Sequence, residues 1–170
     1  MEDKPPYKVI QLVEGEITTK KLITEDLSNT VKLAVIERHK GTGHIGKSYL
    51  KGYGLTAGAI ATSIAHDSHN LIVAGSNEAD MALAANRVRS NEGGLAIALN
   101  GSIIGELPLP IAGLMCAKDT DEVEAILSQL KQQAYNLGVK DSIDPFMTLA
   151  FVSLPVIPEI RLTTKGLVEL

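Results

Sequence analysis

The chain has 170 residues, enough for one domain that buries roughly 70% of its unfolded surface without disulfides. Its net charge of −4 gives no electrostatic reason to expect nucleic acid or an anionic membrane as a partner. The single cysteine, Cys116, excludes an internal disulfide and a cysteine-based zinc cluster, and it fits a cytoplasmic location. No apolar stretch is long enough to span a membrane, and the acidic first residues are unlike a signal peptide.

The first part of the chain is expected to hold two strands joined by a long polar connection. Residues 1–8 are interpreted as a linker or tail, because consecutive prolines at 5 and 6 oppose regular structure. A short strand is expected at 8–13. A stretch rich in Thr, Lys and Glu then runs through residue 30, and the apolar run 31–37 predicts a second strand.

A glycine-rich segment after this strand matches the P-loop pattern GxxxxGK[ST] from Gly41 to Ser48. The chemistry of a P-loop requires a helix that begins at the lysine, so that backbone N–H groups face the phosphates. Glycines at 52, 54 and 58 oppose such a helix, since each costs about 1 kcal/mol relative to alanine. No later strand ends in an acidic residue for magnesium. A nucleotide-binding module is therefore kept only as an alternative.

Two short apolar runs, 59–65 and 71–74, predict a pair of buried strands near the middle of the chain. They are separated by five polar residues, which we call the polar knot: His66, Asp67, Ser68, His69 and Asn70. Polar side chains at a strand end often carry function, although Asp and Asn also suit a purely structural turn. The two histidines and the aspartate could ligate a metal, but no further ligand is evident, so no metal is expected in this chain.

The rest of the chain predicts two helices, a hairpin and a final strand. A helix capped by Asn77 should bury one apolar face, with Asp80 lying off that face; strands at 94–99 and 102–107 flank an Asn100–Gly101 turn. The apolar segment 107–115 should pack inside the domain or against a partner. A second helix should begin with a capping box at Asp119 and end at Gly138.

Residues 144–154 fit either a short helix beginning at the proline or a strand, and a last strand is expected at 159–163. Several strands with hairpin connections and two clear helices indicate an α+β fold. We expect a mixed, largely antiparallel β-sheet with flanking helices on one or both faces.

Several long motifs, in the same order, closely resemble the C-terminal domain of bacterial adenine deaminases. The resemblance spans most of residues 8–170, and residues 9–170 form one domain on this interpretation. The motifs are RHxGTGxIGK (38–47), KGxGL (51–55), GAIAxSxAHDSHN (58–70), LPLPIAGLM (107–115), DPFMTLxF (144–151), IPE (157–159) and TKG (164–166).

The resemblance implies a place in the amidohydrolase superfamily, whose members carry a metal-dependent (β/α) barrel ahead of this domain. The sequence contains no H-x-H metal motif, and 170 residues are too few for eight βα units. The chain is therefore expected to be the C-terminal portion of a longer enzyme that converts adenine and water to hypoxanthine and ammonia. The divalent metal, manganese, iron or zinc, would belong to the barrel, and the isolated chain should fold without deaminating adenine.

On this interpretation, the polar knot faces the active-site mouth of the barrel, with Arg38, His39 and Lys47 near it. The expected partners are the N-terminal barrel and adenine, and a homo-oligomer is compatible with the apolar segment 107–115. The rival interpretations are a stand-alone interaction or oligomerisation domain without catalysis, and the P-loop module.

Overall fold

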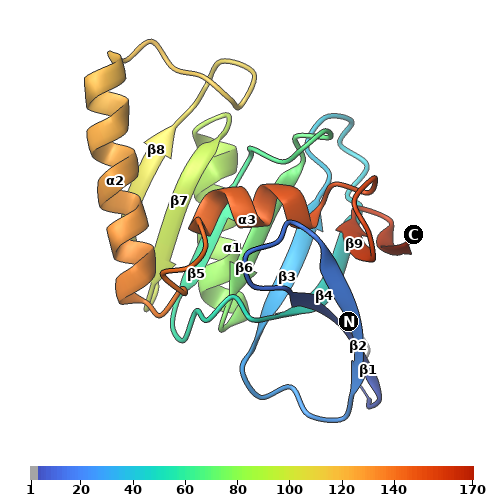
Figure 1. The fold of residues 1–170 in the computed structure, drawn as a ribbon. Coiled ribbons are helices and arrows are strands. Elements are labelled where there is room, and N and C mark those ends of the chain that lie inside the picture. Colours follow the sequence, from blue (N-terminus) through green and yellow to red (C-terminus); the bar gives the residue numbers. More distant parts are fainter. Residues whose placement is uncertain (1–3) are drawn as a thin grey trace.

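A computed structural model describes residues 4–170 as an eight-stranded sheet with helices on both faces (Figure 1). The strand order is β2-β1-β4-β3-β6-β5-β7-β8, and neighbours are antiparallel except for β1 and β4. The predicted α+β class is confirmed. The sheet strands are β1 Tyr7–Leu12, β2 Thr19–Thr24, β3 Thr30–Ile36, β4 Ile45–Lys51, β5 Ala59–Thr62, β6 Leu71–Gly75, β7 Gly94–Leu99 and β8 Ser102–Pro108.

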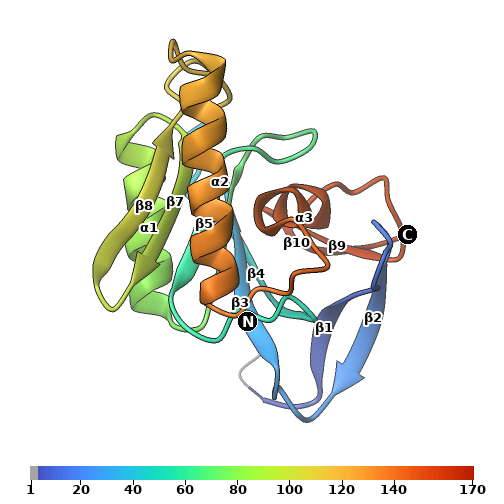
Figure 2. The same cartoon turned by 60° about the vertical axis from the view of Figure 1, so that its left-hand side comes forward.

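Three helices and a small hairpin complete the described part of the chain: α1 Glu78–Ser90, α2 Thr120–Asn136, α3 Pro145–Val152, β9 Ile160–Thr163 and β10 Gly166–Glu169. Figure 2 shows α1 on one side of the sheet, and α2 and α3 on the other with the β9–β10 hairpin. None of these helices, within residues 4–170, is long and apolar enough to cross a bilayer.

The two faces of the sheet are packed with side chains of different size. The core beneath α1 is built mainly from alanines of α1, β5 and β7, which let the helix lie close to the strands. At Gly75, an added Cβ would lie 2.4 Å from Cγ of Met81. The opposite core, beneath α2 and α3, holds most of the large aliphatic side chains and the fully buried Tyr53.

The central strand pair, the Asn77 cap and the Asn100–Gly101 turn are confirmed. Asn77 Oδ1 accepts a hydrogen bond from Asp80 N at 2.8 Å. Both turn residues have positive φ, 50° and 77°, as a type I′ turn requires. The expectation that Asp80 lies off the buried face is wrong: its side chain is 3% exposed. Its carboxylate accepts hydrogen bonds from the backbone N–H groups of both turn residues, which fastens the β7–β8 hairpin to α1.

The strand expected at 8–13 is β1, which begins at Tyr7, inside the segment interpreted as a tail; residues 1–3 lie outside the described part. Three other strands, β2, β4 and β10, were not expected from the sequence. β2 is an edge strand with lysines, and β4 runs through the end of the P-loop pattern. In β4, Gly46 lies against the C-terminal hairpin so closely that an added Cβ would stand 1.8 Å from the carbonyl oxygen of Thr163. The third is β10, which pairs with β9.

The ambiguous stretch after Asp144 is a helix rather than a strand. Asp144 Oδ1 accepts hydrogen bonds from Phe146 N and Met147 N, and Pro145 opens α3. The capping box predicted for α2 is wrong, because Asp119 stands at the N-cap without a side-chain capping bond. Segment 107–115 is only half buried, since Leu107 and Leu109 are covered while Ile111 and Met115 are 49% and 57% exposed.

Candidate functional site

The polar knot connects β5 to β6, and two other loops lie against it. One is the segment 37–44 between β3 and β4, which we call the glycine loop; the other is residues 109–116 after β8. Ser63 Oγ accepts a hydrogen bond from Gly94 N at 2.7 Å and donates one to the carbonyl of Gly113 at 2.6 Å. Nothing in the sequence around Ser63 indicated this role. The loops therefore form one continuous edge of the domain.

Arg38 ties the three loops together. Its Nε donates to the carbonyl of His69 and its Nη2 to the carbonyl of Ala112, each at 2.9 Å. Its backbone N–H also donates to Asn70 Oδ1 at 3.2 Å. Both carbonyls belong to non-glycine residues with positive φ, 46° and 58°, a conformation that persists when surrounding contacts hold it. The guanidinium thus fixes two unusual backbone turns at once.

His39 adds a second tie to the polar knot. Its Nε2 lies 2.7 Å from the carbonyl oxygen of Ser68. Because a carbonyl can only accept, Nε2 must carry the ring proton. The predicted clustering of Arg38 and His39 with the knot is therefore seen in the structure.

Inside the knot, structural and free side chains separate clearly. His69 Nδ1 accepts from Ala65 N, and Ser68 Oγ accepts from Asn70 N, each at 3.4 Å. By contrast, the side chains of His66 and Asp67 make no hydrogen bond to any residue between 4 and 170. The His66 ring instead lies 5.2 Å from the ring of Phe151 on α3. Two of the five knot residues are therefore available to bind a ligand, held in place by the other three.

Acid weakens this arrangement. Burial, with smaller effects from His66 and the nearby Arg38 and His39, lowers the pKa of His69 below its usual 6.5. A neutral imidazole is required for Nδ1 to accept from Ala65 N. The unfolded chain binds a proton on this residue more readily than the folded one, so stability falls as the pH drops below about 6.5.

The glycine loop is organised by a carboxylate that the sequence did not single out. Glu37 Oε1 accepts from the backbone N–H of His39 at 2.5 Å and of Lys40 at 2.7 Å, and Oε2 accepts from Thr42 N at 3.1 Å. The Thr42 N–H lies inside the P-loop pattern, among the backbone groups that a P-loop would offer to a phosphate. Here it is bound by the protein's own carboxylate, and β4 stands where the P-loop helix would begin. The geometry of a P-loop is therefore absent from this loop.

The hollow beside the glycine loop is also unlike a phosphate-binding site. A cavity of about 610 Å³ opens between the glycine loop and the end of α1, and its charged lining residues are Glu37, Arg38, Arg89 and Glu92. Two positive and two negative side chains leave no net charge to select phosphate groups.

Replacing Glu37 with glutamine should loosen the glycine loop. The N–H groups of Thr42, Lys40 and His39 hold the pKa of Glu37 at about 2. Since this value lies below that of an unfolded glutamate, the loop should be held above about pH 4.5 and released as the pH falls towards 2. We expect the Thr42 amide resonance to shift upfield in Glu37→Gln and, in the parent chain, to titrate with a midpoint near 2. Glu25→Gln, at an exposed glutamate, is the control. If the Thr42 amide resonance changes neither in Glu37→Gln nor with pH, Glu37 does not hold the glycine loop.

Lys47 does not join the polar knot, contrary to expectation. It lies in β4 opposite Ala34, whose side chain belongs to the core beneath α1. There it lines a hollow with Glu78 and Met81 of α1. The alternation of side chains along β4 explains this position, because the neighbouring Gly46 and Ser48 occupy the opposite face.

Metal ligation by this chain is not supported by the arrangement of its donor side chains. Across residues 4–170, no three His, Cys, Asp or Glu side chains converge in a way that could hold a metal ion. A catalytic metal site requires at least three protein ligands. The donor set of the described residues therefore does not fit the metal implied by the resemblance.

Comparison with known proteins identifies the family. The family described as "Adenine deaminase C-terminal domain" matches residues 10–170. The chain belongs to this family. "Adenine deaminase 2" of Carboxydothermus hydrogenoformans is 46% identical over 95% of the chain, and "Adenine deaminase" of Desulfatibacillum aliphaticivorans is 46% identical over 97%. "Adenine deaminase" of Nitratidesulfovibrio vulgaris is 48% identical over 82%.

These matches cover 30%, 29% and 24% of the relatives' own lengths. The adenine deaminase C-terminal domain described here therefore corresponds to less than a third of each relative. The resemblance inferred from the sequence motifs is confirmed.

Proposed function

We propose that this adenine deaminase C-terminal domain works as part of a longer, metal-dependent and cytoplasmic enzyme of purine metabolism in the amidohydrolase superfamily. That enzyme would convert adenine and water to hypoxanthine and ammonia. The divalent metal, manganese, iron or zinc, would be held by an N-terminal barrel, because the donor side chains of residues 4–170 do not converge. The relatives named adenine deaminase support this proposal, since each carries more than twice as much sequence besides the matched part.

In this enzyme, the polar knot would lie at the mouth of the active site. The observation that carries the proposal is the pair of free side chains, His66 and Asp67, presented by a loop whose other residues are fixed by Arg38 and His39. A turn with only a structural role needs neither free side chain. An imidazole and a carboxylate can both hydrogen-bond to amino and ring N–H groups of a purine. Both side-chain types also serve as general acids or bases in enzymes.

The test is alanine substitution of His66 and Asp67 in a longer enzyme that contains this domain. Either change should lower kcat/KM for adenine at least tenfold, equivalent to about 1.4 kcal/mol of transition-state stabilisation. The matched control is His44→Ala, at an exposed histidine of the glycine loop. Activity and thermal unfolding should be measured together. Unchanged kcat/KM with a lowered melting temperature would show that the knot is only structural.

A stand-alone interaction domain is the competing proposal. Calorimetric titration of the 170-residue chain with adenine and hypoxanthine bears on it directly. Purine binding that is lost in His66→Ala would favour the active-site proposal even without the barrel.

A further inference from the structure

The helix α3 is apolar on all sides, although only one side is covered. Its eight residues include no charged side chain, and Thr148 is its only polar one. The inner face of α3 is buried and carries Phe146, Leu149, Ala150 and Val152. On its outer face, Met147 is 38% exposed and Phe151 is half-buried. A helix that is hydrophobic all round is normally buried on all sides. The outer face of α3 is therefore suited to contact with further protein.

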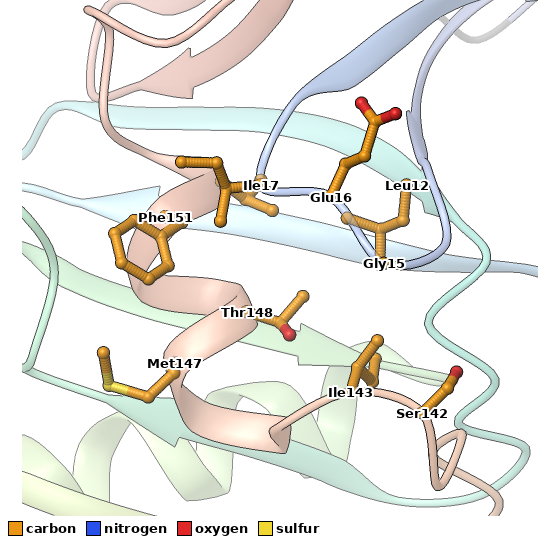
Figure 3. Close-up of a pocket in the computed structure, with 10 residues that line it drawn as sticks. Leu12, Gly15, Glu16, Ile17, Ser142, Ile143, Met147, Thr148 and Phe151 are labelled. Atoms are coloured by element: carbon orange, nitrogen blue, oxygen red, sulfur yellow. The ribbon is translucent and has the colours of Figure 1, made fainter.

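A groove runs along this outer face. It has a volume of about 290 Å³ and lies between α3 and residues 15–17 of the β1–β2 connection. Figure 3 shows Ile17 beside Phe151, with Met147 one turn earlier on α3. Ile17 is 58% exposed, and just beyond α3 Val156 is 72% exposed. We call this surface the α3 groove.

The α3 groove is continuous with the polar knot. Phe151 lines the groove and also contacts the ring of His66, at 5.2 Å between ring centroids. A protein segment seated in the groove would therefore reach the free imidazole of the knot. One contact surface would include both features.

We propose that the α3 groove is the surface on which this domain docks to the N-terminal part of the same longer polypeptide, through an apolar segment of that part. The inference rests on the proposed function. The occupant is inferred from the length of the relatives. Two relatives match 95–97% of this chain, and about 70% of their own sequence lies outside the matched part. In such a polypeptide that remainder is tethered to every copy of the domain, at an effective concentration that a separate molecule does not match.

The experiment compares thiol labelling rates with and without the N-terminal part. Met147→Cys is made in a Cys116→Ser background of the 170-residue chain. It is also made in a chimera in which this chain replaces the matched part of the C. hydrogenoformans adenine deaminase 2. Labelling of the peptide bearing residue 147 is followed by mass spectrometry. Ile23→Cys is the matched control, because Ile23 is 53% exposed on β2, outside the groove.

We expect labelling at position 147 to be at least tenfold slower in the chimera than in the isolated chain, and labelling at position 23 to change less than twofold. Equal rates at 147 in both proteins would overturn the proposal, as would equal slowing at both positions. A labelling rate at position 147 that falls as the concentration of the isolated chain rises would assign the groove to a second copy of the chain. That result would also overturn the proposal. If the chimera does not fold, the cysteine is placed at the aligned position of the intact relative.

Ammonia release from adenine by the chimera is measured separately. An active chimera with fast labelling at 147 would overturn the docking surface and leave the proposed function standing. Slow labelling in an inactive chimera would support the docking surface while the proposed function fails.

Discussion

Replacing Arg161 with alanine should destabilise the domain by about 3 kcal/mol, through loss of several hydrogen bonds from a charged donor. Arg161 lies at the start of the C-terminal hairpin and is 0% exposed. Its Nη1 donates to Thr19 Oγ1 at 2.8 Å, and its Nη2 donates to the carbonyls of Ile17 at 2.7 Å and Pro158 at 3.0 Å. Without the guanidinium, these acceptors would be left without their charged donor.

No carboxylate of the described residues is in hydrogen-bonding contact with Arg161. Burial lowers its pKa to about 10, which still leaves the side chain charged at neutral pH. Carbonyl dipoles from the β1–β2 connection and from the segment before β9 replace the missing counter-charge. This arrangement fastens the C-terminal hairpin to the edge of the sheet, together with the backbone bonds between Thr19 and residues 158 and 159.

Thermal unfolding measures the effect. For a domain of this size, a loss of about 3 kcal/mol lowers the melting temperature by roughly 6–12 °C. Hydrogen exchange should also become faster in β9 and β10 before global unfolding. Arg89→Ala is the control, because Arg89 is an exposed arginine of α1 and should change stability by less than about 0.5 kcal/mol. A melting temperature of Arg161→Ala equal to that of Arg89→Ala would contradict the prediction.

Replacing Gly93 with alanine should cost about 3 kcal/mol, because the new methyl group would overlap backbone atoms that cannot turn aside. Gly93 has a φ of 138°, and an added Cβ would lie 2.3 Å from Cα of Gly113 and 3.0 Å from the carbonyl oxygen of Leu109. Gly113 in turn lies against the guanidinium of Arg38, so relief of the overlap would displace the loop that Arg38 ties to the polar knot.

The matched control for this change is Gly101→Ala. Gly101 also has positive φ, 77°, but an added Cβ there meets nothing within 4 Å. The control should therefore show only the cost of a left-handed alanine, about 1 kcal/mol. Chemical denaturation of both variants separates backbone strain from overlap, and equal losses of stability would contradict a close contact at Gly93. In a longer enzyme, Gly93→Ala should also lower activity, through displacement of the knot.

Local sequence determined the elements whose stabilising contacts lie within a few residues. The cap at Asn77, the turn at Asn100–Gly101 and the helix-starting Asp144–Pro145 each depend on contacts between near neighbours, so short patterns predicted them or kept them as one of two alternatives. The order and length of the motifs also determined the family. The resemblance to this family indicated the kind of enzyme. The chemistry of the individual residues in this chain would not have indicated it.

Only the tertiary structure decided how the loops meet. Arg38 reaches Ala112, 74 positions away, and Arg161 reaches Thr19, 142 positions away. Such pairs leave no periodic signal in the sequence, because the fold brings the partners together. The same reason explains the errors: Asp80 is buried by a distant hairpin turn, and Lys47 faces α1 because β4 continues through the glycine-rich motif. His66 and Asp67 are singled out because their side chains make no hydrogen bond within the described part of the chain, whereas their neighbours in the knot do. That difference depends on residues that only folding brings close.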